Sequence, residues 1–365
     1  MVKGVRRVSK VAMAVAALIA ASQAAVYTQI NPYRLVDGLQ AGLGTGKSGV
    51  MWPKLPGGRK VGSPAGLDID KDGESLWAAL RCGNDTTPIG SQTDCDNSNL
   101  DPIVRFDKDG NVTRSFGRGM FSWPHGLHVD PDGNIWVTEA RAPKPEPGKK
   151  PIGHQVFKFS PDGKLLLTLG EAGVPGKDNA HFNTPTDVTS SPDGTMYIAD
   201  GHNADGNNRV MMFTKDGKFI KSFGETGYGP GQMRILHAIA RDPATGNIYI
   251  ADRGNQRVVI FDKDGKYLNR WTQFGMPSDV VFDNNGRIYV ADSESDIREN
   301  PGWATGIRIG NAKTGVVEWF IPDPMHNPAF DGHGSGTESL AIDKNGNIFA
   351  GEPRPQRLQK YIKVF

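Results

Sequence analysis

The stretch GLHVDPDGNIWVTEA at residues 126–140 decides the fold, because five further copies of it occur along the chain. Each copy has a short apolar segment, a turn rich in Asp, Asn and Gly, and a second apolar segment that usually ends in an acid. The other copies begin at Gly66, Asp187, Ala238, Asp279 and Ser339. A repeat of roughly 40 to 60 residues with about four strands is typical of a propeller blade, since one such unit cannot bury its own apolar face. The six copies predict an all-β, six-bladed β-propeller.

The length and charge of the chain restrict the number of domains and the kinds of partner that we expect. The 365 residues would ordinarily suggest two domains, but a closed ring of repeats is stable only as a whole, so we expect one propeller domain at residues 26–365. The formal net charge is +2, from 42 basic and 40 acidic residues. No basic stretch is interleaved with aromatic residues, which argues against a nucleic-acid partner. We expect a monomer.

The N-terminus has the pattern of a secretory signal. Four basic residues within the first ten precede the apolar run VAMAVAALIA and a stretch of small residues. This pattern predicts a signal peptide at residues 1–25 and a secreted or periplasmic protein that is not an integral membrane protein after cleavage. An uncleaved anchor is the alternative. In an exported chain, Cys82 and Cys95 are expected to form a disulfide.

The sixth repeat lacks an outer strand before the chain ends. The segment YRLVDGLQAGLGTG at residues 33–46 resembles the outer strands that precede the other repeats, such as LLLTLGEAGVPG. We therefore expect this N-terminal segment to fill the sixth blade and close the ring, which would leave no open sheet edge.

The residue just before each copy is here called its hub position. The hub positions are Ala65, His125, Thr186, His237, Ser278 and Glu338. Alternate blades of a six-fold ring are 120 degrees apart, so His125, His237 and Glu338 can converge on the axis. Two imidazoles and a carboxylate are a normal ligand set for zinc, and also for iron or manganese. His333 is a rival third ligand, and a hydrogen-bonded capping role is the alternative for each histidine.

Three further residues follow second strands and should lie at the same end of the propeller, because antiparallel strands joined by hairpins begin and end together. Arg81 and Arg253 could clamp a carboxylate near the metal, or could form surface salt bridges. His202 could act as a general acid or base if it faces the same cavity.

The segments WPHGLHVDPDGNIWVTEA, HFNTPTDVTSSPDGTMYIADG and GPGQMRILHAIARDPATGNIYIADRGNQRVVIF resemble the NHL-repeat propellers, specifically the peptidyl-α-hydroxyglycine α-amidating lyases. The resemblance covers four of the six blades well. It implies zinc held by three hub histidines, a structural calcium, and cleavage of a carbinolamide C–N bond to give a peptide amide and glyoxylate. By this resemblance His125 and His237 match zinc ligands, and Arg81 and Arg253 match active-site arginines.

The chain departs from that family at three positions. The third zinc histidine falls on Glu338, the calcium-binding aspartate falls on Ser339, and the catalytic tyrosine falls on His202. Calcium is therefore not expected, and a phenol cannot be exchanged for an imidazole without changing the proton transfer.

These departures favour an altered substrate range over true peptide amidation. We expect a metal-dependent, lyase-like enzyme that cleaves a C–N or C–O bond in a small carbonyl or α-hydroxy substrate. The substrate is expected to be a small molecule or a peptide with an anionic group. A metal-dependent hydrolase is one alternative. A non-catalytic NHL propeller that binds a protein or glycan is another, because the fold alone does not dictate chemistry.

Overall fold

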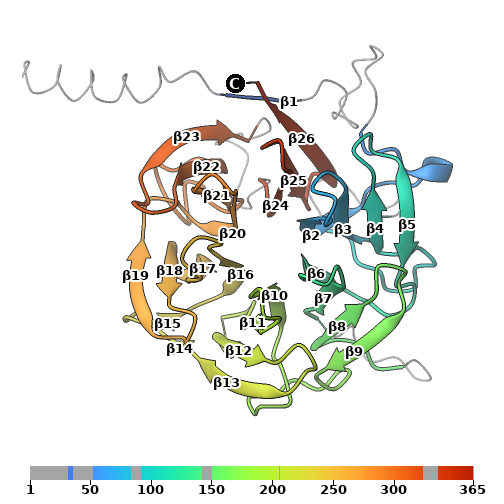
Figure 1. Cartoon of the computed structure of the whole chain (residues 1–365), viewed down its shortest axis with the longest axis horizontal. Helices are drawn as coiled ribbons and strands as arrows, with labels where there is room; N and C mark the ends of the chain where they lie inside the picture. The colour runs from blue at the N-terminus through green and yellow to red at the C-terminus, as the bar shows by residue number, and fades with distance from the viewer. Residues whose placement is uncertain are drawn as a thin grey trace, which may run out of the picture. The chain divides into compact units, whose positions relative to one another are not determined.

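The computed structural model describes residues 32–35, 52–83, 92–141, 150–204, 206–323 and 336–364. The described residues from Tyr33 to Val364 form one compact unit. In this unit six four-stranded antiparallel sheets are arranged around a central axis (Figure 1). The predicted six-bladed β-propeller is therefore confirmed. The predicted signal peptide lies outside the described residues, and no described helix is long and apolar enough to span a membrane.

Each blade is numbered here by its repeat, and its strands are given from the axis outward. Blade one contains β2 (Ser63–Ile69), β3 (Leu76–Arg81), β4 (Ile103–Phe106) and β5 (Val112–Phe116). Blade two contains β6 (Pro124–Val129), β7 (Ile135–Glu139), β8 (Gln155–Phe159) and β9 (Leu165–Leu169). Blade three contains β10 (Pro185–Ser190), β11 (Met196–Asp200), β12 (Arg209–Phe213) and β13 (Phe219–Phe223).

The second half of the ring repeats this plan. Blade four contains β16 (Leu236–Arg241), β17 (Ile248–Asp252), β18 (Arg257–Phe261) and β19 (Tyr267–Trp271). Blade five contains β20 (Pro277–Phe282), β21 (Arg287–Asp292), β22 (Gly306–Asn311) and β23 (Val317–Pro322). Blade six contains β24 (Ser339–Ile342), β25 (Ile348–Glu352), β26 (Arg357–Lys363) and, outermost, β1 (Tyr33–Leu35). The remaining elements are β14 (Glu225–Thr226), β15 (Gln232–Met233) and two 3-10 turns, η1 (Pro56–Gly58) and η2 (Arg253–Asn255).

The outer position of blade six is taken by a strand from the other end of the chain. β1 pairs antiparallel with β26, and Tyr33 lies opposite Lys363 in this register. The Tyr33 hydroxyl also lies 3.0 Å from the Tyr289 hydroxyl of blade five, and both rings are buried. The first described residues are thus bonded into the ring next to its last strand.

The core lies between neighbouring blades, because both faces of the inner strands are covered. All five residues of β7 are buried, whereas β9 at the blade edge is largely exposed. Between blades one and two, Trp77 and Phe116 pack with Phe121 and Phe159 from the next repeat. At the other ends of the inner strands, the Asp-Gly turns are stabilised by an aspartate side chain that accepts backbone N–H groups of the turn. In blade two, the Asp130 carboxylate accepts the N–H of Asn134 at 2.8 Å, and Gly133 adopts a φ of +89°.

A buried acid ends the second strand in every blade except blade one. These residues are Glu139, Asp200, Asp252, Asp292 and Glu352, each fully buried. Several of them fix the start of the inner strand by accepting a backbone N–H, as Asp200 does from Asn183 at 2.7 Å. In blades three to six the same acid also pairs with an arginine from the third strand. These arginines are Arg209, Arg257, Arg308 and Arg357.

Among the described residues, no arginine side chain is hydrogen-bonded to Glu139, and this gives it a testable pH dependence. Burial raises the pKa of Glu139 from 4.5 to about 8, although the N–H groups of Trp123 and Ser122 oppose the shift. A raised carboxyl pKa means that stability is fully present below the unfolded pKa and is lost as pH rises through the folded pKa. Between about pH 5 and about pH 8, the unfolding free energy should fall relative to that of Glu139→Gln by about 1.4 kcal/mol per pH unit. Denaturant titrations of both proteins check this, and parallel pH profiles would contradict it.

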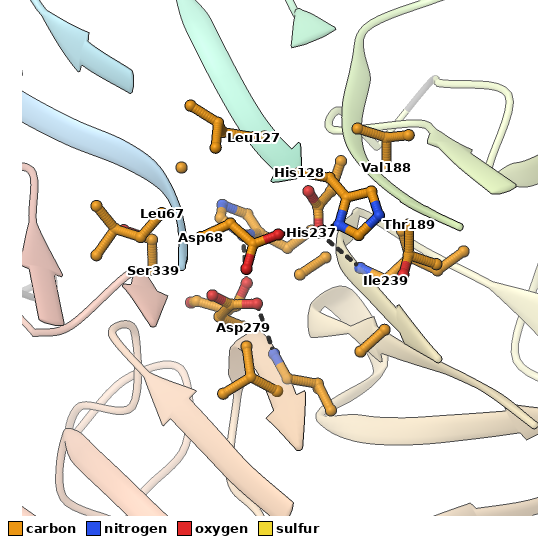
Figure 2. Close-up of a pocket in the computed structure, with 18 of the residues that line it drawn as sticks. Leu67, Asp68, Leu127, His128, Val188, Thr189, His237, Ile239, Asp279 and Ser339 are labelled. Carbon is orange, nitrogen blue, oxygen red and sulfur yellow. Dashed lines mark hydrogen bonds and ion pairs between the residues drawn. The ribbon is translucent and has the colours of Figure 1, made fainter. Parts of the chain in front are cut away.

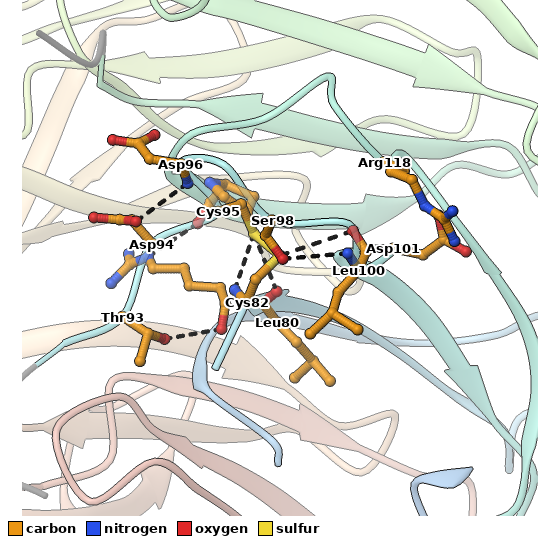
Figure 3. The surroundings of a disulfide bond; sticks show 12 residues. Leu80, Cys82, Thr93, Asp94, Cys95, Asp96, Ser98, Leu100, Asp101 and Arg118 are labelled. Atoms are coloured by element: carbon orange, nitrogen blue, oxygen red, sulfur yellow. Dashed lines mark hydrogen bonds and ion pairs between the residues drawn. A yellow bond between two sulfur atoms is a disulfide. The ribbon is translucent and has the colours of Figure 1, made fainter. Parts of the chain in front are cut away.

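A disulfide joins Cys82 to Cys95 beside the end of β3 (Figure 3). The part of the bridged loop just before Cys95 contacts the same strand end: the Thr93 hydroxyl donates to the Arg81 carbonyl at 2.9 Å, and the Gln92 side chain accepts a hydrogen bond from the Arg81 guanidinium. The bridge therefore holds a polar segment against Arg81, one of the predicted site residues.

Candidate metal centre

Four side chains from blades two, three, four and six lie close together. They are His125 on β6, His202 just after β11, His237 on β16 and Glu338 just before β24, and they are here called the His/Glu group. Each offers one ligand atom, and these atoms all lie within 4.8 Å of one another. The structure thus brings the three hub residues together, as the register predicted, and adds His202 to them.

The ring orientation of the two hub histidines is set by backbone carbonyls of the next blade. Nδ1 of His125 lies 2.9 Å from the carbonyl oxygen of Thr186, and Nδ1 of His237 lies 2.6 Å from that of Ser278. A carbonyl can only accept, so each Nδ1 must donate its proton. Nε2 of each ring then faces the centre of the group. A hydrogen bond to the remote nitrogen is the usual way in which proteins orient metal-binding histidines.

Two of the inward nitrogens are buried without a partner. Nε2 of His125 and Nε2 of His202 make no hydrogen bond to any described residue. The His202 ring centre lies 4.9 Å from that of His125 and 5.1 Å from that of His237. A buried polar atom without a partner is costly, so two of them aimed at one point indicate a ligand there.

The third inward nitrogen faces the carboxylate. Nε2 of His237 lies 2.8 Å from Oε1 of Glu338, and both side chains are buried. Because Nδ1 already donates to Ser278, Nε2 must either carry a second proton or share a cation with the carboxylate. A metal ion at this point would replace that proton and satisfy both atoms.

The electrostatics of the group keep the imidazoles neutral and the carboxylate charged. Burial, helped by the neighbouring histidines and arginines, holds the pKa values of His125 and His202 well below their usual range. Burial opposes ionisation of Glu338, but the His237 hydrogen bond and the charge of Arg81 hold its pKa well below the usual value. Neutral imidazoles and an ionised carboxylate are the protonation states that metal binding requires.

Both predicted arginines lie beside the group. Arg81 is fully buried and stacks on Trp123, with Cζ 3.5 Å from the ring centre, and its Nη2 has no partner among the described residues. Burial lowers the pKa of Arg81 to about 10. Nη1 of Arg253 lies 4.0 Å from Oε1 of Glu338 and 3.8 Å from a carboxylate oxygen of Glu294.

Sequence reasoning missed Trp123 and Glu294. The Trp123 ring contacts both His125 and His202, with ring centres 5.3 and 5.2 Å apart. Its position two residues before a hub histidine, in the motif WPHG, was a usable signal. Glu294 follows the second strand of blade five, at the same end as Arg253, and no motif distinguishes it. The rival ligand His333 lies outside the described residues.

The channel below the group is hollow. A cavity of about 290 Å³ is lined by His125, His237 and Glu338 and continues along the inner strands (Figure 2). Two carboxylates, the half-buried Asp187 and the buried Asp279, lie in its wall and bridge neighbouring blades: Asp187 accepts the N–H of Ile239 at 3.0 Å, and Asp279 that of Leu340 at 2.6 Å. The His/Glu group therefore faces a space that could admit water.

Comparisons with known proteins agree with this architecture. A family model described as a 6-bladed beta-propeller matches residues 177–285. The peptidyl-glycine alpha-amidating monooxygenase of Mus musculus is 34% identical over 218 residues, which are 55% of this chain and 20% of that protein. A probable peptidyl-alpha-hydroxyglycine alpha-amidating lyase of Caenorhabditis elegans is 28% identical over 314 residues, which are 82% of each chain.

A solved structure shows the same fold at a lower identity. The gluconolactonase of Xanthomonas campestris superimposes with a TM-score of 0.54 at 15% identity, over 83% of this chain and 87% of that one. The chain spans about a fifth of the length of the mouse relative but most of the nematode lyase. It is a six-bladed β-propeller that resembles the peptidyl-α-hydroxyglycine α-amidating lyases.

Proposed function

We propose that this protein is an exported, metal-dependent lyase that cleaves the C–N bond of a small α-hydroxy substrate with an anionic group. The observation that carries the proposal is the His/Glu group, in which two buried Nε2 atoms have no described partner and a third faces a carboxylate. Support for the reaction comes from the amidating lyases among the relatives. The N-terminal segment, which has the pattern of a signal peptide, supports export.

The donor set fits a divalent transition metal. Three imidazole nitrogens and one carboxylate suit zinc, with iron and manganese as further candidates, whereas calcium prefers sites made of oxygen. His125, His237 and Glu338 would hold the ion. When bound, such an ion supplies Lewis acidity toward a substrate oxygen.

The arginines would bind and orient the substrate. Nη2 of Arg81 is buried without a described partner, and the stacking on Trp123 keeps its guanidinium in place. A carboxylate can accept two parallel hydrogen bonds from such a group. Arg253 lies beside Glu338 and Glu294, and would bind the same anion or its neighbour.

His202 is placed to move a proton. Its pKa is lowered well below the usual value, chiefly by burial, so the ring is neutral and its unpaired Nε2 can accept a proton from a substrate hydroxyl. Cleavage of the C–N bond would leave the hydroxyl carbon as an aldehyde and return a proton to the amide nitrogen. His202 is also close enough to be a fourth metal ligand. The metal content of His202→Ala distinguishes the two roles, because a variant that binds as much metal as the wild type has lost a proton carrier and not a ligand.

The test of the proposed function is the release of glyoxylate from an N-acyl-α-hydroxyglycine by the metal-loaded protein. We expect release with one metal bound per chain, and a loss of about 100-fold or more in kcat/KM for Arg253→Met, since a charge-assisted clamp on an anion is removed. Arg118→Met, at an exposed position whose contact is a loose pair with Asp101, is the matched control. A metal-loaded protein that releases no glyoxylate and cleaves no other α-hydroxyamide acid would contradict the proposal.

A further inference from the structure

A second group of polar side chains lies at the opposite ends of the inner strands. Asp68 on β2, His128 on β6 and Ser190 on β10 come from three consecutive blades. Nδ1 of His128 lies 3.0 Å from Oδ2 of Asp68, and Nε2 lies 2.7 Å from the Ser190 hydroxyl. Figure 2 shows Asp68 and His128 side by side in the wall of the channel. A carboxylate, an imidazole and a hydroxyl are thus joined in one chain of hydrogen bonds.

The carboxylate is held in a fixed orientation. Oδ1 of Asp68 accepts the N–H of Ile69 at 2.8 Å, and Oδ2 accepts that of Val129 at 2.8 Å. An ionised carboxylate requires Nδ1 of His128 to carry the proton, so Nε2 is the acceptor that faces Ser190. This is the arrangement that prepares a serine hydroxyl to lose its proton, with the base oriented by a third group.

At the last position of the inner strand, two blades have a polar residue where the other four have an apolar one. The last residue of each inner strand pairs with the first residues of the second strand, and in four blades it is apolar: Ile69, Val129, Phe282 and Ile342. In blades three and four the same register holds Ser190 and Arg241. Apolar side chains at these two positions would pack against the neighbouring blades equally well. Packing therefore does not explain why Ser190 and Arg241 are polar.

Ser190 and His128 both line an open space. A cavity of about 480 Å³ at this end of the channel is lined by His128, Ser190, Arg241 and Lys71, among others. Its size matches the range of small-molecule sites. Lys71 and Arg241 line this cavity together with the Asp130 carboxylate, and the two cations can stabilise negative charge that develops on a carbonyl oxygen. If the Asp68–His128–Ser190 hydrogen bonds served only to join three blades, neither a cavity nor cationic side chains would be needed beside them.

We propose that Ser190 is the nucleophile of a second active site, which hydrolyses a small carboxylic ester. Oγ of Ser190 attacks the ester carbonyl while its proton passes to Nε2 of His128. The alcohol leaves with that proton, and the acyl group stays on Ser190. Water then attacks the acyl-serine with His128 as base, which releases the carboxylic acid and restores the hydroxyl. Asp68 acts as a positioning residue, and Arg241 binds the carbonyl oxygen. This site involves none of the His/Glu group and does not depend on a metal.

The test uses the full chain and a fluorophosphonate, which reacts with activated serines by forming an O–P bond and releasing fluoride. Intact-mass spectrometry should show one adduct, and peptide mapping should place it at Ser190. Ser190→Ala should abolish the adduct, and His128→Gln should slow its formation by about 100-fold or more because the base is lost. Ser191→Ala is the matched control, since the neighbouring hydroxyl bonds Asp193 in the turn and not His128.

Hydrolysis of p-nitrophenyl acetate gives the second readout. Activity should survive treatment with a metal chelator and disappear in Ser190→Ala, which separates it from the metal centre. The proposal is overturned by an absence of adduct under excess reagent, by equal labelling in His128→Gln, or by an esterase activity that Ser190→Ala retains. The variants are compared only if their far-UV circular dichroism and melting temperatures match those of the wild type.

Discussion

Replacing His237 by Ala is expected to weaken metal binding by at least about 100-fold, since changes in the groups that merely orient a ligand already cost 10- to 100-fold. Nε2 of His237 lies 2.8 Å from Oε1 of Glu338, and its Nδ1 is fixed by the Ser278 carbonyl, so the variant loses an oriented ligand atom. After reconstitution and desalting, the wild type should hold about one equivalent of metal, and the variant less than about 0.1 equivalents.

The control for this experiment is His181→Ala, at a histidine bonded to Asp178 and outside the His/Glu group. This variant should bind metal as the wild type does. His237→Ala should keep the far-UV spectrum of a folded propeller, because the ring is held mainly by packing between blades. A wild-type protein that binds less than about 0.1 equivalents of every transition metal tested would refute the metal-dependent lyase. Full metal content in His237→Ala would refute the proposed ligand set.

Arg257→Met is expected to lower the free energy of unfolding by about 3–5 kcal/mol, because it leaves a buried carboxylate without its cation. Nε of Arg257 donates to Asp252 at 2.6 Å, and both side chains are buried. The guanidinium also donates to the carbonyl oxygens of Tyr228 at 2.9 Å and Gln232 at 2.7 Å, in the loop that leads into blade four. At about 2 °C per kcal/mol, the melting temperature should fall by roughly 6–10 °C.

The companion variant is Arg257→Met combined with Asp252→Asn. If the uncompensated charge causes the loss, the second change should restore part of the stability, because the amide can still accept a hydrogen bond without a buried charge. Arg114→Met removes an exposed arginine paired with Asp162 and should change the unfolding free energy by less than about 0.5 kcal/mol. A loss in Arg257→Met no larger than in Arg114→Met would contradict the expected role of the buried pair.

The sequence by itself determined the architecture and the register of the site. The recurring phrase carries the turn residues and the β-branched strands of each blade, and these are local properties that a single repeat displays. Its spacing defined the six hub positions, because equal positions in successive blades lie at equal depth along the axis. His125, His237 and Glu338 are the hub residues that carry an imidazole or a carboxylate. The same register placed Arg81 and Arg253 at that end of the channel.

Only the tertiary structure decided which neighbours these residues have. His202 lies one position beyond the register of Arg81 and Arg253, and only the conformation of the chain after β11 brings its ring to the centre. Trp123 contacts the group, and Glu294 contacts Arg253 beside it, through the packing of separate loops. Ser190 joins His128 and Asp68 across three blades, and hydrogen bonds between side chains far apart in sequence depend on distances that no repeat pattern contains. The repeat therefore determines the ring, whereas the contacts between blades determine which side chains meet in it.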